Sequence, residues 1–161
     1  MRDTPPEARP THRRAARRSE SGASAVEFAL VLPVLILLLG GIIDFGFIFS
    51  QQIALNNAAR DAARAGVVQP LTGTARTCSQ LTTIARNSLS GGVGMSAAAV
   101  TVTPSRSDGV NPCSTTRPCT GAPGGTQLVV QATFASSPPF PVPFLGTVNL
   151  RAKGAFQCEY A

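Results

Sequence analysis

The pattern of hydrophobic and polar positions divides the chain into three regions. Residues 1–22 are polar and basic, residues 23–67 are apolar and then amphipathic, and residues 68–161 mix short alternating stretches with Pro- and Gly-rich connections. No residue from Phe28 to Ile43 is charged. A helix from Ala25 to Phe49 is roughly 35 Å long, enough to cross a hydrocarbon core of about 30 Å. The pattern predicts one membrane-spanning helix, ending at about residue 49, and a small domain after it.

The helix is expected to continue beyond the membrane to residue 67. From residue 50 onward, small apolar residues recur every three or four positions, which indicates an amphipathic helix. This stripe consists of Ile53, Ala54, Ala58, Ala62 and Ala65. We expect the stripe to pack closely against another helix and the charged residues beside it to face solvent. Gly66 and Pro70 are expected to end the helix.

Four residues of the apolar stretch are candidates for a kink or for helix packing. Pro33 removes a backbone hydrogen bond, so a bend is expected there. Gly40 and Gly41 form either a second weak point or a close-packing surface. Asp44 lies near the outer end of the span, where we expect it to mark the interface with water, with a role in binding a partner as the alternative.

The third region predicts a small α+β domain. Leu81, Ile84, Ala85 and Leu89 share one face of an expected helix over residues 75–89. Alternation of apolar and polar residues predicts three antiparallel strands, at residues 98–103, 127–134 and 147–156, with Phe156 on the inner face of the last. Residues 104–125 are interpreted as a loop, and the Pro-rich residues 138–143 as an extended connection.

The distribution of charge orients the chain. The formal net charge is +6, and much of it comes from arginines that precede the apolar stretch. The positive-inside rule places that end in the cytoplasm and the C-terminal domain outside, in a single-pass protein of the cytoplasmic membrane. These arginines are Arg2, Arg9, Arg13, Arg14, Arg17 and Arg18. No aromatic residues alternate with them and no nucleic-acid-binding motif follows, so we do not expect the protein to bind nucleic acid. The expected partner of the apolar helix is the lipid bilayer.

All four cysteines follow the apolar stretch, on the side where disulfides persist. Three pairings are open to them. We expect the sequence-local pair Cys113–Cys119, with Cys78–Cys158 joining the C-terminus to the region after the long helix. A metal site is not expected, because Cys-x-x-Cys is absent and the only histidine, His12, precedes the membrane span.

The sequence gives no sign of catalysis. It contains no nucleophile-elbow, phosphate-loop or zinc-protease motif, and the C-terminal region has no histidine. We expect no enzymatic activity, no cofactor and no small-molecule substrate.

One carboxylate, Glu27, lies just inside the apolar stretch, where an unpaired charge costs several kcal/mol. Glu27 is preceded by Gly22-Ala23-Ser24-Ala25-Val26 and followed by Phe28. These residues resemble the prepilin processing motif. The continuation at residues 29–33, and residues 41–46 and 57–65, resemble the TadE-like family of pseudopilins from tight-adherence (Flp) pili. Major Flp pilins tend to carry Tyr where this chain has Phe28, which favours a minor, TadE-type component.

The resemblance implies a function as a structural component in pilus assembly, adhesion or secretion. It implies that prepilin peptidase removes residues 1–22 by cutting between Gly22 and Ala23. It also implies that Glu27 and Phe28 are recognised by the peptidase and take part in pilus assembly. The new amine at Ala23 would lie four residues before Glu27, on about the same helix face. Other pilins and the pilus assembly platform are the implied partners. The resemblance does not decide whether the protein is incorporated into the filament or stays in the membrane.

Two alternatives are compatible with the sequence. The apolar stretch could belong to an ordinary signal peptide, although it is longer than such a segment and runs into another helix. The chain could also be an uncleaved single-pass anchor whose outer domain binds a ligand. That alternative predicts an intact N-terminus and tolerance of Glu27→Ala.

Overall fold

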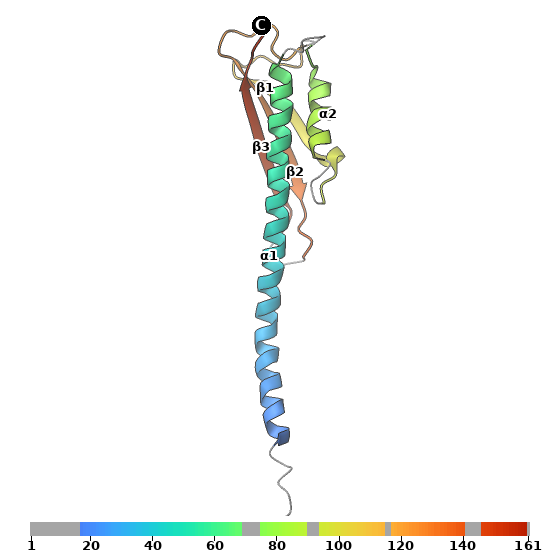
Figure 1. Ribbon diagram of the computed structural model, residues 1–161, viewed down its shortest axis with the longest axis vertical. Helices are drawn as coiled ribbons and strands as arrows, with labels where there is room; N and C mark the ends of the chain where they lie inside the picture. The colour runs from blue at the N-terminus through green and yellow to red at the C-terminus, as the bar shows by residue number, and fades with distance from the viewer. Residues whose placement is uncertain (1–16, 69–74, 90–93, 115–116, 141–145, 161) are drawn as a thin grey trace, which may run out of the picture. The chain divides into compact units, whose positions relative to one another are not determined.

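The computed structural model describes residues 17–68, 75–89, 94–114, 117–140 and 146–160. Helix α1 (Arg17–Val67) is followed by α2 (Cys78–Ser88), the short 3₁₀ helix η1 (Ala97–Ala99), and the strands β1 (Thr101–Arg106), β2 (Gln127–Ser136) and β3 (Val148–Gln157) (Figure 1). Contacts divide the chain into two units, Met1–Leu39 and Gly40–Ala161. The expected α+β class, with one short helix and three antiparallel strands after a long apolar helix, is confirmed.

The first unit contains the N-terminal part of α1. The helix begins at Arg17, earlier than the expected start at Ala23, and Pro33 lies inside it without ending it. Residues 17–21 contain no proline or glycine and include arginine and glutamate, which favour helix, so the early start is consistent with local propensity. The large apolar side chains of this part are exposed, as Leu30 (74%) and Val34 (65%) illustrate. Within the described residues, one helix is long and apolar enough to span a membrane.

The second unit packs two helices on one face of the sheet. The strand order is β1-β2-β3, and both pairings are antiparallel. Figure 1 shows the C-terminal half of α1 and helix α2 lying beside the strands. The covered face of the sheet consists of Leu128, Val130, Ala132 and Phe134 from β2, and Leu150, Ala152 and Gly154 from β3. The inward face expected for β2 is confirmed, whereas Phe156 is 36% exposed and does not belong to the core.

The buried side of α1 is rotated from the expected stripe. Ile53 is 47% exposed, and Leu55, Ala59 and Ala63 are fully buried beside Ala58 and Ala62. The reason is that this side of the helix meets both the sheet and α2, rather than a single helix. Ala62 and Ala63 pack in one cluster with Ala85 of α2 and Val130 of β2. The charged side chains of Arg60, Asp61 and Arg64 are exposed as expected.

Helix α2 begins with a capping box. The Thr77 hydroxyl accepts from the Gln80 N–H, and the Gln80 side chain accepts from the Thr77 N–H, which satisfies two donors at the helix start. Leu81, Ala85 and Leu89 are buried, as the spacing predicts.

The first strand was predicted too early. Ala97–Ala99 form η1, and β1 covers Thr101–Arg106, so part of the expected loop is strand. Pro104 is tolerated because β1 is an edge strand, where one side of the backbone has no ladder partner. Strand β2 extends two residues further than expected, to Ser136. Pro138–Phe140 lie outside any strand, and the remainder of the Pro-rich connection, with Pro70, lies outside the described residues.

The expected cysteine pairing is wrong. The disulfides are Cys78–Cys113 and Cys119–Cys158, with Cα–Cα distances of 5.6 and 5.7 Å. Cys119 is buried against Leu128, and the Cys158 N–H donates to Thr126 O, so the end of β3 is held beside Cys119. Proximity in sequence therefore gave the wrong partner. The two disulfides tie the 107–126 loop to α2 on one side and to the end of β3 on the other.

A buried arginine orders the same loop. Arg106 donates to both carboxylate oxygens of Asp108 and to Thr120 O. Burial opposes ionisation of Asp108, but hydrogen bonds from Arg106 and from the Val110 N–H, together with the charge of Arg106, outweigh it. The pKa of Asp108 is therefore lower than its ordinary value.

Asp108→Asn is expected to lower the Tm of the C-terminal domain at neutral pH, because Arg106 loses its counterion. A carboxylate with a lowered folded-state pKa contributes stability above its unfolded pKa of about 3.9 and loses it as pH falls through the folded value. The Tm difference between wild type and variant should therefore be full at pH 6 and shrink below about pH 4. Circular dichroism melts across this pH range measure it, with Asp61→Asn as the exposed control.

Candidate functional site

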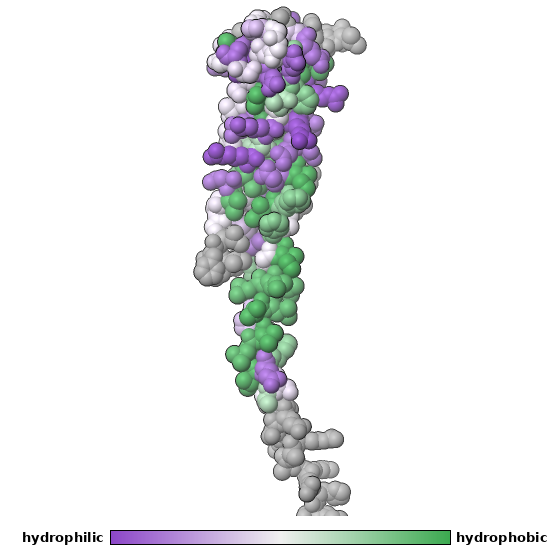
Figure 2. All heavy atoms as spheres, turned by 90° about the vertical axis from the view of Figure 1, so that its left-hand side faces the viewer, coloured by the Kyte–Doolittle hydropathy of each residue, from purple (hydrophilic) through white to green (hydrophobic). Residues whose placement is uncertain are grey.

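The expected processing segment lies on an exposed stretch of α1. A Cβ added at Gly22 would have no atom within 4 Å, and residues 22–31 are exposed. Figure 2 shows hydrophobic side chains covering the visible surface of the apolar part of the helix. The Gly22–Ala23 peptide bond itself is within the helix, since α1 begins at Arg17. A peptidase that cuts there has open access to the segment but has to unwind it locally.

Glu27 is the carboxylate of this segment. Its neighbours Val26 and Phe28 are 62% and 63% exposed, so the charged group is set in an apolar outer surface. None of the hydrogen bonds or ion pairs among the described residues involves Glu27. A carboxylate on an apolar surface is costly in lipid unless a cation reaches it. The arrangement thus fits a charge that is neutralised by a cation that the described residues do not supply.

The glycine pair of α1 is asymmetric. A Cβ at Gly40 would lie 2.5 Å from Cδ1 of the Phe140 ring, whereas a Cβ at Gly41 would meet nothing within 4 Å. Gly40 is therefore a close-packing position, but its partner is a loop residue rather than a helix. Asp44, one turn later, is fully buried, and its Oδ1 accepts from the Phe140 N–H at 2.9 Å. Its other oxygen, Oδ2, is buried without a hydrogen-bond partner. This contact was not predictable from local sequence patterns, because Phe140 lies 96 residues away.

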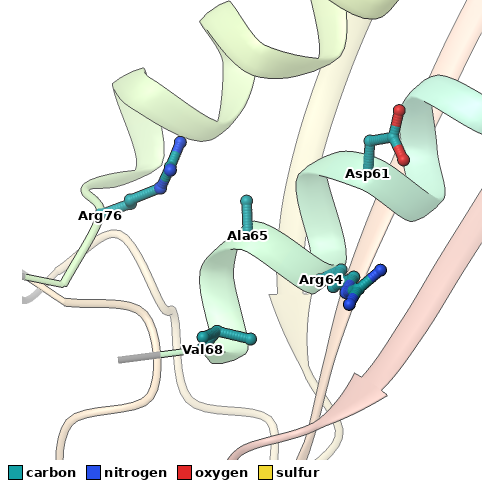
Figure 3. A pocket seen from close by; sticks show the side chains of 5 residues that line it. All are labelled: Asp61, Arg64, Ala65, Val68 and Arg76. Atoms are coloured by element: carbon teal, nitrogen blue, oxygen red, sulfur yellow. The ribbon is translucent and has the colours of Figure 1, made fainter. Parts of the chain in front are cut away.

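A shallow hollow of about 320 Å³ lies between the end of α1 and the start of α2. Figure 3 shows its lining, with Arg64 on α1 and Arg76 on the segment that leads to α2. The remaining lining residues are Asp61, Ala65 and Val68, so the hollow offers charge but no nucleophile. Among the described residues, no group of three or more His, Cys, Asp or Glu side chains is arranged to hold a metal ion.

Comparison with protein families gives one finding, and it covers the segment described above. The family model described as TadE-like protein matches residues 22–64. Residues 22–64 are TadE-like. The match confirms, over these residues, the resemblance drawn from the sequence. Together with the apolar helix, it indicates membrane anchoring.

The TadE-like match ends inside α1, three residues before the last residue of the helix. No curated protein and no solved structure matches the chain. The match therefore covers the helix alone, and the properties of the disulfide-linked domain follow from its own contacts.

Proposed function

We propose that this protein is a minor pilin or pseudopilin of a Tad pilus, matured by cleavage after Gly22. The observation that carries the proposal is the position of the family match, which begins at Gly22, five residues before the lone carboxylate Glu27. The same segment is exposed and apolar, as a helix that packs among other membrane helices has to be. In this proposal the protein joins, primes or supports the filament and carries out no catalysis.

Cleavage would convert the exposed segment into an assembly element. The new amine at Ala23 and the carboxylate of Glu27 are four residues apart, so they lie on about the same face of α1. In lipid, each charge alone is costly, and the two together are neutral. When helices pack side by side, the Glu27 of one subunit neutralises the Ala23 amine of its neighbour and so sets their axial register.

The C-terminal domain belongs outside the cytoplasm in this proposal. Its two disulfides persist in an oxidising compartment, and the arginines of residues 1–18 favour the opposite side for the N-terminus. The proposed location is the cytoplasmic membrane, with the helix crossing once. The proposed partners are prepilin peptidase, the other pilins and the assembly platform.

The proposal predicts a selective effect of Glu27→Ala. Removing one member of a buried ion pair costs about 3 kcal/mol or more, which corresponds to a loss of roughly 100-fold in association. We expect Glu27→Ala to reduce the amount of protein that co-purifies with other pilus subunits by roughly 100-fold. The helix should still insert into the membrane. Co-purification from detergent extracts, quantified by immunoblot, measures it.

The matched control is Asp61→Ala, which removes an exposed carboxylate from the same helix beyond the apolar stretch. We expect this control to behave as wild type. If Glu27→Ala also co-purified at the wild-type level, the assembly role of Glu27 would be wrong, and an uncleaved membrane-anchored domain would explain the protein better.

A further inference from the structure

The segment that follows β2 runs back along α1 toward the apolar part of the helix. At its start, the Ser136 hydroxyl donates to Gln51 Oε1. Four residues further on, the Phe140 N–H donates to Asp44 Oδ1, and the Phe140 ring packs on Gly40. Residues 137–140 thus descend along the helix from the level of Gln51 to that of Gly40, away from the sheet.

The surface of α1 at this level is apolar. Ile42, Ile43, Phe45 and Phe49 are 58–73% exposed. Asp44 is the only charged residue between Gly40 and Phe49, and it is fully buried. No charged side chain of α1 therefore reaches the surface where Phe140 lies.

The backbone of the segment has few donors to satisfy. Pro138 and Pro139 have no N–H, so the segment has two backbone N–H groups, those of Ser137 and Phe140, and the Phe140 N–H is bonded to Asp44. An unsatisfied N–H in an apolar phase costs several kcal/mol, so this bond lowers the cost of placing Phe140, at the end of the segment nearest Gly40, against lipid. The carbonyl oxygens still require donors, which water and lipid headgroups supply at the interface but not at the bilayer centre.

We propose that residues 137–140 form a second membrane contact, in which Phe140 lies beside α1 at the glycerol level of the outer leaflet. The apolar surface formed by Phe140 and the neighbouring exposed residues of α1 contacts the acyl chains and glycerol groups of phospholipid. Asp44 is a positioning residue that acts by binding the Phe140 N–H. The inference rests on the proposed membrane insertion of α1, and it fixes the depth at which the outer domain sits.

Single tryptophans test this inference, because the chain contains none. The full-length protein carrying Phe140→Trp would be reconstituted in vesicles of phosphatidylcholine and phosphatidylglycerol. A fraction of the phosphatidylcholine would be brominated either near the glycerol or near the chain end. Ile36→Trp reports on the span, and Phe156→Trp, at the far end of β3, reports on the part of the domain remote from lipid.

We expect Phe140→Trp fluorescence to be quenched at least twofold more than that of Phe156→Trp, and more by bromine near the glycerol than by bromine near the chain end. Quenching of Ile36→Trp without quenching of Phe140→Trp would overturn the inference and leave membrane insertion intact. Failure to quench Ile36→Trp would overturn both. An emission shift of Phe140→Trp that depends on protein concentration but not on bromine would assign the surface to a second copy of the chain, against the inference.

Asp44 variants test the positioning role in the Phe140→Trp background. Asp44→Asn keeps an oxygen acceptor, so we expect it to retain the quenching by bromine near the glycerol. Asp44→Leu removes the acceptor and keeps the helix apolar, so we expect at least half of that quenching to be lost. Equal quenching in the two variants would show that Asp44 does not position Phe140. Normal helix content by circular dichroism is required of each variant before the comparison.

Discussion

Gly154→Val is expected to unfold a large fraction of the C-terminal domain. An added Cβ at Gly154 would overlap the Ala59 carbonyl group and lie 2.7 Å from Arg60 Cα. All three nearest atoms are backbone atoms of α1, so no side-chain rotation relieves the overlap. Overpacking usually costs 1–3 kcal/mol. Because β3 or the whole helix has to move here, we expect a loss of about 3 kcal/mol or more.

For a domain of this size, that loss corresponds to a decrease in Tm of more than about 10 °C. Thermal circular dichroism of the detergent-solubilised protein measures it. Gly146→Val makes the same chemical change just before β3, where an added Cβ meets nothing within 4 Å. We expect a Tm near that of wild type for this control. A wild-type Tm for Gly154→Val would mean that β3 does not cross α1 as closely as described.

A second large loss of stability is expected when the Cys119–Cys158 disulfide is removed. The two disulfides span sequence separations of 35 and 39 residues, so the loop-closure contribution of each is about 4 kcal/mol. Cys119 is also fully buried beside Leu81 and Leu128, whereas Cys113 is exposed. We therefore expect the double variant Cys119→Ser/Cys158→Ser to lose more stability than Cys78→Ser/Cys113→Ser, which serves as its matched comparison.

Chemical denaturation of both double variants under non-reducing conditions measures the two losses. A single variant tests the pairing independently. Cys78→Ser should free the Cys113 thiol for alkylation, and the label would not appear on the tryptic peptide of residues 154–161, which contains Cys158. A label on that C-terminal peptide would instead support the Cys78–Cys158 pairing and contradict the structure.

The elements of this protein were predictable where their signals are local. The long apolar helix, the inward face of β2 and the buried positions of α2 follow from periods of 3.6 and 2, which depend only on neighbouring residues. The resemblance that names Gly22 and Glu27 is also local, since these residues lie in one short stretch, and the family match covers it.

The contacts that the sequence patterns did not predict all join residues that are far apart in the chain. The rotation of the α1 stripe toward Leu55 and Ala59 depends on how a sheet and a second helix share one helix face. The disulfide pairing depends on the end of β3 reaching Cys119. Asp44 shows the same limit, since a single carboxylate near a membrane surface predicts exposure unless a distant loop, here at Phe140, covers it. Pro104 was misjudged because its place on an edge strand is a property of the sheet.

The most direct test of the central proposal is the N-terminal residue and mass of the membrane-extracted protein, produced with and without co-expressed prepilin peptidase. The proposal predicts a chain that begins at Ala23 only when the peptidase is present, and an uncut chain for Gly22→Leu in both cases. A chain that keeps residues 1–22 beside a peptidase that cuts a known prepilin would contradict it. A chain that begins beyond Phe49 would contradict the membrane-spanning role of α1 as well.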